Sequence, residues 1–323
     1  MTARRVLSCA MLCVWVAFAT VSATAQVFPA KPVKLVVPFP AGILDTVARL
    51  LAKELAERWG QPVIVENKPG AGGNIGAEAV AHAPADGSVF LVGGTSLIIN
   101  VPLHGQVPYS LMKDLRPVSL VARLPFVIVV NPAVPARSLD ELIAYARGHP
   151  GKLNFGSGGN GTVPHVSGEL FKLKANVDVV HIPFKGAAAT VTELVAGRID
   201  MAIDTATPYL PFITRGELRA LAVPSAHRLI NLPDVPTTKE AGLDDFETGA
   251  WVSLWAPGGT PQPIIEQVAR DVAAITGSPA IKEEWSKRGI EATVSNPEEF
   301  SAFAAAELRK WTDVVRKSGA KVD

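Results

Sequence analysis

The sequence is poor in cysteine. It contains only two, Cys9 and Cys13, and both lie near the N-terminus. If this N-terminal segment is removed, the rest of the chain has no thiol for a disulfide bond, a thiolate metal site or a nucleophile. Stability then depends on a hydrophobic core alone, and a chain of 323 residues is long enough to form one.

Neither sign of charge is in excess. The chain has 31 Lys and Arg against 30 Asp and Glu, whereas a nucleic-acid-binding surface needs a basic excess. We therefore expect no nucleic-acid partner. The six histidines lack the H-x-x-x-H spacing that is typical of metal sites, so we expect no metal and no other cofactor.

Long apolar runs are also missing, except at the N-terminus. There, Arg4 and Arg5 precede an uncharged apolar run, Val6 to Val21, which is followed by Ala23-Thr24-Ala25. This order is typical of a secretory signal peptide. The run is shorter than the ~20 residues that a membrane span prefers, which argues against the alternative, a membrane anchor. We predict cleavage after Ala25, so that residues 1–25 are removed, and export to the periplasm.

The rest of the chain alternates short apolar runs with segments of helical period, a pattern that predicts an α/β fold with parallel strands. The predicted strands are 34–39, 62–67, 89–94 and 126–132, and the runs LNFGS, VDVVHIPF, IDMAID, LRALAV and WVSLWAP. Two C-terminal amphipathic helices are expected over 261–276 and 296–318. The second begins with Asn296, a favourable N-cap, followed by Pro297.

The length favours two domains. We place the chain crossings near Leu124 and Ser225, which makes domain 1 from residues 26–124 and 226–323 and domain 2 from residues 125–225. In such folds a ligand binds in the crevice at the carboxyl ends of the parallel strands. The loops that follow the strands are therefore the candidate site.

The most conspicuous of these loops is FGSGGNGTVPH, which starts at Phe155 and contains the G-x-G-x-x-G spacing of a dinucleotide-binding turn. Asp178 follows at the expected distance, but it lies at the start of the next strand rather than at its carboxyl end, where a ribose would be. An anion cradle formed by the amides of Gly158 through Thr162 at a helix N-terminus fits better. The alternative is a tight turn that merely needs glycine at positive φ.

The first loop, Pro40 to Leu44, occupies the matching place in domain 1, and its amides could meet the other end of a ligand. Asp45 is expected to cap a helix that begins at Thr46. A third glycine cluster, NKPGAGGNIGAEA, is interpreted as a backbone turn against the cleft.

Two further strand ends carry polar residues. Lys185, before Gly186 and Ala187, could attract an anion or could be a solvated surface lysine. Asp204, before Thr205, could accept a hydrogen bond from an ammonium or hydroxyl group or could cap a following helix.

No catalytic set is apparent. Ser157 and His165 could form a nucleophile and a base, but no G-x-S-x-G elbow accompanies them. His165 is better explained by local packing or hydrogen bonding at a helix start. We therefore do not expect an enzyme.

Taken together, several segments resemble a known family. They include FPAKPVKLVVPFPAG, ENKPGAGGNIGAEAVA, FGSGGNGTVPHVSGELF, HIPFKGAAA, GRIDMAID, LPDVPTTKEAG and WVSLWAPGGTP, in this order. The chain from residue 26 onward resembles the Bug-type periplasmic solute-binding proteins of tripartite tricarboxylate transporters.

The resemblance implies a two-domain type II periplasmic-binding-protein fold that closes on a small carboxylate and delivers it to the membrane permease subunits. It implies ligand contacts from the first loop (Pro40, Ala41, Gly42, Ile43 and Leu44), the glycine loop (Ser157, Gly158, Gly159, Asn160, Gly161 and Thr162), the third loop (Lys185, Gly186 and Ala187), and Asp204 and Thr205. We expect a monomer.

The first loop departs from the family pattern P-x-G-G-x-x-D. It is one residue shorter and carries Ile43 and Leu44 in place of small residues. An aromatic or apolar carboxylate, or a smaller pocket, therefore becomes more plausible than the usual dicarboxylate pose. Two alternatives to solute delivery remain: a binding protein that serves a sensor kinase, and an exported hydrolase or isomerase that uses His165 or Asp204.

Overall fold

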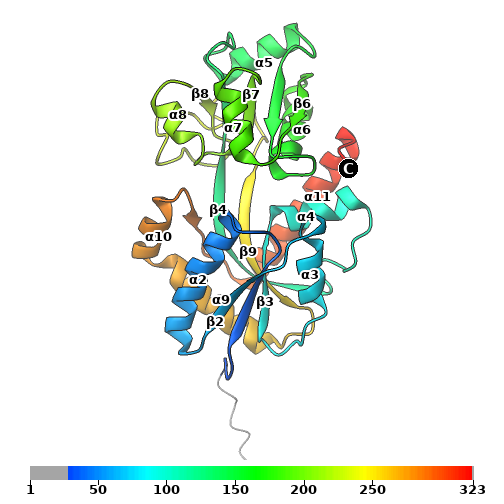
Figure 1. The fold of residues 1–323 in the computed structure, drawn as a ribbon, viewed down its shortest axis with the longest axis vertical. Coiled ribbons are helices and arrows are strands. Elements are labelled where there is room, and N and C mark those ends of the chain that lie inside the picture. The colour runs from blue at the N-terminus through cyan, green and yellow to red at the C-terminus, as the bar shows by residue number, and fades with distance from the viewer. Residues whose placement is uncertain (1–27, 322–323) are drawn as a thin grey trace, which may run out of the picture.

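The computed structural model describes residues 28–321; the predicted signal peptide and the cleavage site after Ala25 lie outside this range. The described chain forms two lobes stacked along the long axis (Figure 1). Two strands, β4 (Leu115–Val130) and β9 (Gly249–Pro257), run between the lobes. Of the helices within residues 28–321, none combines the length and apolarity that a membrane crossing requires.

The first lobe is built on three parallel strands, in which Leu35 of β1 pairs with Val65 of β2 and with Phe90 of β3. Its elements are β1 (Val33–Val37), α2 (Ile43–Trp59), β2 (Val63–Asn67), η1 (Ala71–Gly73), α3 (Asn74–Ala81), β3 (Val89–Gly94), α4 (Thr95–His104), α9 (Gln262–Gly277), α10 (Pro279–Ser286), β10 (Glu291–Ala292) and α11 (Pro297–Ser318).

The second lobe repeats the strand-then-helix order. Its elements are α5 (Leu139–Gly148), β5 (Asn154–Ser157), α6 (Val163–Ala175), β6 (Val180–Pro183), α7 (Ala187–Val195), β7 (Met201–Thr205), α8 (Leu210–Thr214) and β8 (Arg219–Ala222). The predicted strands and the two C-terminal helices are thus confirmed with shifts of a few residues at their ends, except that the strand predicted from residue 126 already begins at Leu115.

The sheet differs from the predicted parallel arrangement at the junction of the lobes. The strand order is β2-β1-β3-β9-β4-β7-β5-β6, with β8 and β10 also paired to β4. Residues 115–125 of β4 pair antiparallel with β9, and residues 126–130 pair antiparallel with β7. The chain leaves the first lobe on β4 and returns on β9, so these two strands necessarily run in opposite directions.

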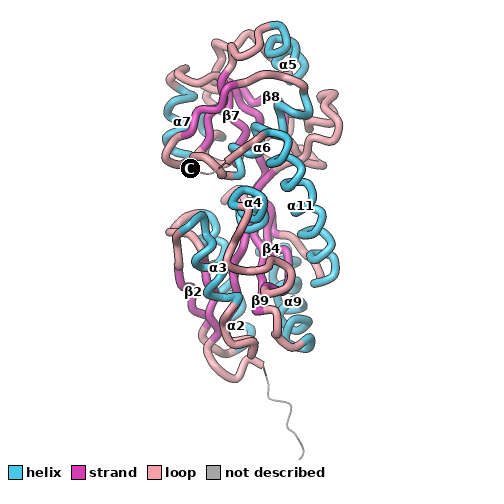
Figure 2. The backbone as a smooth tube through the Cα atoms, turned by 90° about the vertical axis from the view of Figure 1, so that its right-hand side faces the viewer, coloured by secondary structure: helices cyan, strands magenta, loops and turns pink. Residues whose placement is uncertain are grey.

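The C-terminal helix α11 packs on both lobes. It contacts α4 and β4 and, near its end, α6 of the second lobe (Figure 2). Phe300 packs edge-on against Trp255 of β9 with ring centroids 5.0 Å apart. Trp311 is fully buried in a core cluster that also contains Phe171 of α6. This helix is therefore a third connection between the lobes.

The segment that follows β8 packs on the second lobe before the chain returns. Leu229 and Leu232 belong to the same apolar cluster as Val127 and Tyr209. Thr238 Oγ1 donates to the carbonyl of Phe246. The segment between β8 and the start of β9 at Gly249 is therefore associated with the second lobe.

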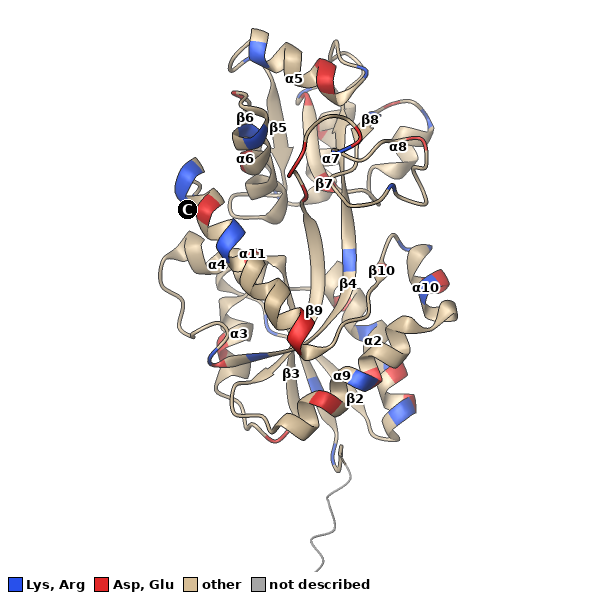
Figure 3. Ribbon diagram, turned by 180° about the vertical axis from the view of Figure 1, so that it is seen from behind, with Lys and Arg blue, Asp and Glu red and all other residues tan. Residues whose placement is uncertain are grey.

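Both signs of charge occur on the outer helices α10 and α11 (Figure 3). Their ion pairs are short-range, such as Lys287 with Glu283 at 2.8 Å and Lys317 with Asp313 at 2.7 Å. These pairs are solvent-exposed, so each contributes little to stability.

Candidate functional site

A cleft lies between the two lobes, beside the two strands β4 and β9 that run between them and that we call the hinge strands. Its volume is about 640 Å³. Phe39 and Gly72 come from the first lobe, and Asn160 and Asp204 from the second. The remaining lining residues are Ala71, Ser96, Asn100, His104, Phe126, Gly161, Thr162, Val163, Pro164, Thr205 and Ala250. Loops after parallel strands meet here, as expected for this class of fold.

The glycine loop joins β5 to α6 and lines the second-lobe wall of the cleft through Asn160, Gly161 and Thr162. Gly159 and Gly161 have φ values of 132° and 75°, a region that residues with a Cβ rarely adopt. Helix α6 begins directly after the loop, with Pro164 in its first turn. The backbone conformation therefore requires glycine at both positions. The same loop also faces the cleft.

Several amides of the loop already donate within it. Gly159 N donates to Ser157 Oγ at 3.2 Å, Gly161 N to His165 Nδ1 at 3.0 Å, and Thr162 N to Gly159 O at 3.3 Å. A ligand carboxylate that used these amides would have to replace one of these bonds. The cradle predicted from the sequence thus has fewer open donors than the glycine spacing indicates.

Ser157 lies under the loop rather than on its surface. Its side chain is fully buried, and its hydroxyl is 2.7 Å from His181 Nε2. The His181 ring stacks on that of His165. The prediction that His165 makes a local hydrogen bond at a helix start is confirmed by its bond to Gly161 N.

The third loop contacts the glycine loop through a backbone hydrogen bond. Gly186 N donates to Gly158 O at 3.1 Å, and the two glycine backbones lie in contact. Ala187 begins α7. Lys185 is exposed, and the residues that line the cleft do not include Lys185, Gly186 or Ala187. Their direct contact with a ligand stays a prediction.

Asp204, the penultimate residue of β7, lines the cleft and is almost fully buried. Its carboxylate accepts from Thr205 N at 2.7 Å and from the hydroxyl of Tyr209 at 3.4 Å. Burial, which penalises the charged form, raises the pKa of Asp204 to about 6. Asp204 therefore accepts a hydrogen bond from a hydroxyl group of the protein itself, and a hydroxyl is one of the two donors that the sequence indicated.

The first loop is exposed from Pro40 to Ile43. Leu44 packs against the apolar cluster of the first lobe. Neither Ile43 nor Leu44 is among the residues that line the cleft, where Phe39 is the nearest lining residue in sequence. The apolar bulk expected at the ligand entrance is thus directed elsewhere in this structure, and ligand contacts by Pro40, Ala41, Gly42, Ile43 and Leu44 stay predictions.

One prediction about this loop is wrong. Helix α2 begins at Ile43 with Gly42 as its N-cap, and Asp45 makes no capping bond. Instead, the Asp45 carboxylate pairs with Arg49 at 2.8 Å and accepts from Asn67 Nδ2 at 2.9 Å. The bond to Arg49 is the main reason that the pKa of Asp45 is lowered. Because the helix starts three residues earlier than predicted, Asp45 lies inside its first turn, one turn before Arg49.

On the first-lobe wall, the third glycine cluster lines the cleft through Ala71 and Gly72 as expected, whereas the contribution of α4 was not predicted. Ser96, Asn100 and His104 recur at every fourth residue of α4 and therefore lie on one face. Asn100 Nδ2 donates to the carbonyl of Gly72 at 2.7 Å, which fixes the glycine turn at the cleft. The signal was present as three polar residues at helical spacing in an otherwise apolar segment, TSLIINVPLH.

No lysine or arginine lines the cleft. Within residues 28–321, no three His, Cys, Asp or Glu side chains form a group that could hold a metal ion. Recognition of an anion in this cleft would therefore depend on amides, hydroxyls and the imidazole of His104.

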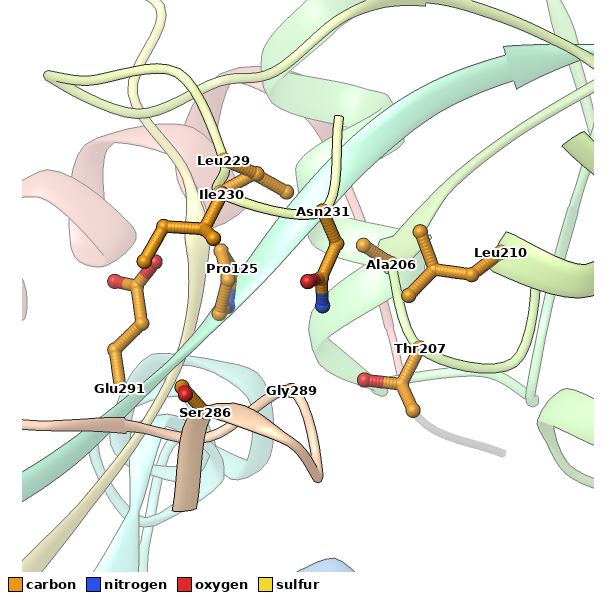
Figure 4. A pocket seen from close by; sticks show the side chains of 10 residues that line it. All are labelled: Pro125, Ala206, Thr207, Leu210, Leu229, Ile230, Asn231, Ser286, Gly289 and Glu291. Carbon is orange, nitrogen blue, oxygen red and sulfur yellow. The ribbon is translucent and has the colours of Figure 1, made fainter. Parts of the chain in front are cut away.

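A second, smaller pocket lies on the opposite side of β4 (Figure 4). Pro125 lines it, whereas its neighbour Phe126 lines the main cleft, and successive residues of a strand point to opposite faces. Its volume is about 40 Å³. Thr207 and Gly289 approach each other here, since a Cβ on Gly289 would lie 2.0 Å from Thr207 Oγ1. This pocket is a contact between the lobes and is too small for a substrate.

The family model described as "Tripartite tricarboxylate transporter family receptor" matches residues 47–320. This chain belongs to that receptor family. BugT of Bordetella pertussis is 36% identical to this receptor over 318 residues, which cover 97% of this chain and 98% of BugT. The resemblance to Bug-type proteins is therefore confirmed.

Solved structures of relatives share the fold of this receptor. An R. palustris protein solved with adipate is 35% identical, has a TM-score of 0.78, and covers 91% of this chain and 100% of its own. MatC from Rhodopseudomonas palustris with bound malate is 33% identical, has a TM-score of 0.74, and covers 89% of this chain and 100% of its own. The predicted fold class is confirmed.

Proposed function

We propose that this receptor binds a small carboxylate in the cleft between its lobes and delivers it to the membrane subunits of a tripartite transporter. The observation that carries the proposal is a polar cleft at the ends of β5 and β7, in a fold shared with relatives that hold adipate and malate. In this proposal Asn160, Gly161 and Thr162 meet one end of the ligand, and the polar face of α4 meets the other.

The lobes correspond to two domains that close on the ligand. We place the first crossing of the chain between the domains at residues 124–125, as predicted. The change of the β4 partner from β9 to β7, one residue further between Pro125 and Phe126, supports this position. The second is placed at residues 248–249 rather than near Ser225, since Leu229 and Leu232 pack in the second lobe. Cleavage after Ala25 would release the receptor into the periplasm, where we propose that it acts as a monomer without binding nucleic acid.

The role is binding rather than catalysis. Ser157 and His181 are close enough for a nucleophile and its base. However, the side chain of Ser157 is fully buried beneath the loop, so a substrate cannot reach its hydroxyl. Turnover of a carboxylate ester panel that disappears in Ser157→Ala would contradict this part of the proposal.

The test is titration calorimetry with succinate, malate, adipate, glutamate and benzoate. We expect at least one acid to bind, and Gly161→Val to weaken that binding by about tenfold or more, about 1.4 kcal/mol. The control is Gly216→Val. Gly216 has a φ of 72°, close to the 75° of Gly161, so valine should cause similar backbone strain at both positions. Gly216 lies in the turn after α8 and is not among the residues that line the cleft.

If Gly161→Val and Gly216→Val bind equally well, the glycine loop does not hold the ligand. If the wild-type receptor binds none of the acids, carboxylate binding itself is contradicted, provided that native mass spectrometry finds no acid retained from expression.

A further inference from the structure

Two histidines stack directly under the glycine loop. The rings of His165, in the first turn of α6, and His181, on β6, have centroids 4.0 Å apart and planes 13° from parallel. Phe155 of β5 also packs on His181, with ring centroids 4.8 Å apart. His165 is almost fully buried. Neither ring is among the cleft-lining residues, so the proposed ligand contacts do not include them.

Each ring makes a hydrogen bond that positions a different part of the glycine loop. His165 Nδ1 accepts the amide proton of Gly161 at 3.0 Å. His181 Nε2 shares a 2.7 Å hydrogen bond with the Ser157 hydroxyl, which in turn accepts from Gly159 N at 3.2 Å. The positions of Gly159 and Gly161, on either side of Asn160, therefore depend on two imidazole rings.

The contact with Gly161 requires a neutral His165, and the close stacking of the two rings disfavours charge on both. Nδ1 of His165 can accept from Gly161 only while it carries no proton. Two charged rings at 4.0 Å would repel each other in a buried site. Lys172, on the same face of α6, adds a further positive charge, and it is paired with Glu169 at 3.1 Å. Burial, the largest cause, together with Lys172 lowers the pKa of His165, and burial, His165 and Lys172 lower that of His181 to about 4.

We propose that the neutral His165–His181 stack is the positioning support of the glycine loop, and that protonation of the stack releases the loop and weakens ligand binding. The part about affinity rests on the proposed carboxylate binding. The part about the loop is independent of any ligand.

The sign of the pH effect follows from the direction of the shifts. Both histidines have a lower pKa in the folded protein than the ordinary 6.5, so an unfolded or released loop takes up protons first. The support is therefore complete above about pH 6.5. It is lost as the pH falls toward about 4, the pKa of His181.

The experiment compares variants that keep or remove the acceptor. In His165→Asn the side-chain oxygen can replace Nδ1 as the acceptor for Gly161 but does not titrate, whereas His165→Leu removes the acceptor. His181→Gln keeps a polar atom near the position of Nε2. The matched control is His149→Asn, because His149 also stacks on a ring of its own lobe, Tyr145 at 4.3 Å, but lies at the far end of α5.

Two readouts are measured at pH 7.5 and pH 5: the Kd of the tightest acid of the panel, and hydrogen exchange of the peptide covering 157–165. At pH 7.5 we expect His165→Leu to weaken binding by about tenfold and to speed exchange, while His165→Asn and His149→Asn stay near wild type. Acidification should weaken wild type and His149→Asn more than the His165→Asn/His181→Gln double variant. Titration of the ligand itself cancels in this comparison.

The proposal is overturned if the double variant and wild type share one pH profile, or if His165→Leu binds and exchanges like wild type. If His165→Leu does not fold, the pH dependence of binding and of hydrogen exchange in the double variant, compared with wild type, still tests the proposal. If no acid binds to wild type, the proposed function fails, and exchange of 157–165 alone tests the histidine support.

Discussion

At the scale of single residues, the least expected feature is a buried carboxylate in a cleft proposed to bind carboxylates. Asp204 accepts from Thr205 N, the Thr205 hydroxyl and the Tyr209 hydroxyl, and none of these three described donors carries a positive charge. Three neutral donors offset only part of the cost of burying the charge. The raised pKa of Asp204, about 6, reflects that remaining cost.

We therefore predict that Asp204→Asn stabilises the protein at high pH. The pKa of Asp204 in the folded protein lies above its ordinary value of 3.8, so the stability associated with its protonated form is complete below pH 3.8 and is lost as the pH rises through about 6. Urea unfolding at pH 8 should show Asp204→Asn more stable than wild type by roughly 1–3 kcal/mol, and the difference should vanish near pH 4. Equal stability of the two proteins at both pH values would contradict this explanation. Asp200→Asn serves as the control, because Asp200 accepts the amide of Asn154 away from the cleft.

At the scale of elements, helix α11 shows how local sequence signals serve a long-range contact. Its N-terminus carries a complete capping box, in which Asn296 accepts from Glu299 N at 2.8 Å and Glu299 accepts from Asn296 N at 3.0 Å. Fifteen residues after the cap, Trp311 is fully buried and donates to Glu307 at 3.0 Å. The cap therefore fixes the start of a helix whose far end reaches the second lobe.

Asn296→Ala should lower the free energy of unfolding by about 1 kcal/mol, the usual cost of removing a cap. Asn296→Asp should cost much less, because aspartate is an equally good N-cap and its charge favours the helix N-terminus. Chemical denaturation of the three proteins measures this. Similar losses for Ala and Asp would mean that the cap does not stabilise α11.

At the scale of the whole molecule, the two lobes meet on both sides of the hinge strands. The ligand cleft lies on one side of β4, and the contact between Thr207 and Gly289 lies on the other. Rotation of the lobes about β4 and β9 that changes the cleft must also change this contact. The chain downstream of the predicted signal peptide has no cysteine, so a disulfide can be introduced there without competing thiols.

We predict that wild type shows a ligand-dependent decrease in radius of gyration in small-angle scattering, and that oxidised Thr207→Cys/Gly289→Cys loses this decrease. The distance from Thr207 Cβ to a Cβ built on Gly289 is 3.2 Å, slightly below the ~3.5–4.5 Å of disulfides. Reduction should restore closure, and Thr207→Cys alone should behave like wild type. A ligand-dependent decrease that persists in the oxidised variant would show that closure does not involve this contact.

Much of the fold could be predicted from the sequence, because its signals are local. Apolar runs such as VFLVGG became β3 at the predicted residues, and the capping signal at Asn296 marked the start of α11. The start of α2 was mispredicted because Asp45 was interpreted as a cap, although its partners are Arg49 and Asn67. A side chain that can cap a helix can equally pair with a cation, and only the fold determines which partner is near.

The α/β class and the glycine loop between a strand and a helix follow from residues close together in the chain, and the family follows from short motifs in a fixed order along it. Which loops share a cleft is visible only in the folded molecule. The tertiary structure showed that the polar face of α4 opposes Asn160, that the amides of the loop are partly engaged, and that two histidines 16 residues apart stack beneath it. These features depend on how distant strands align in one sheet, and no local pattern specifies that alignment.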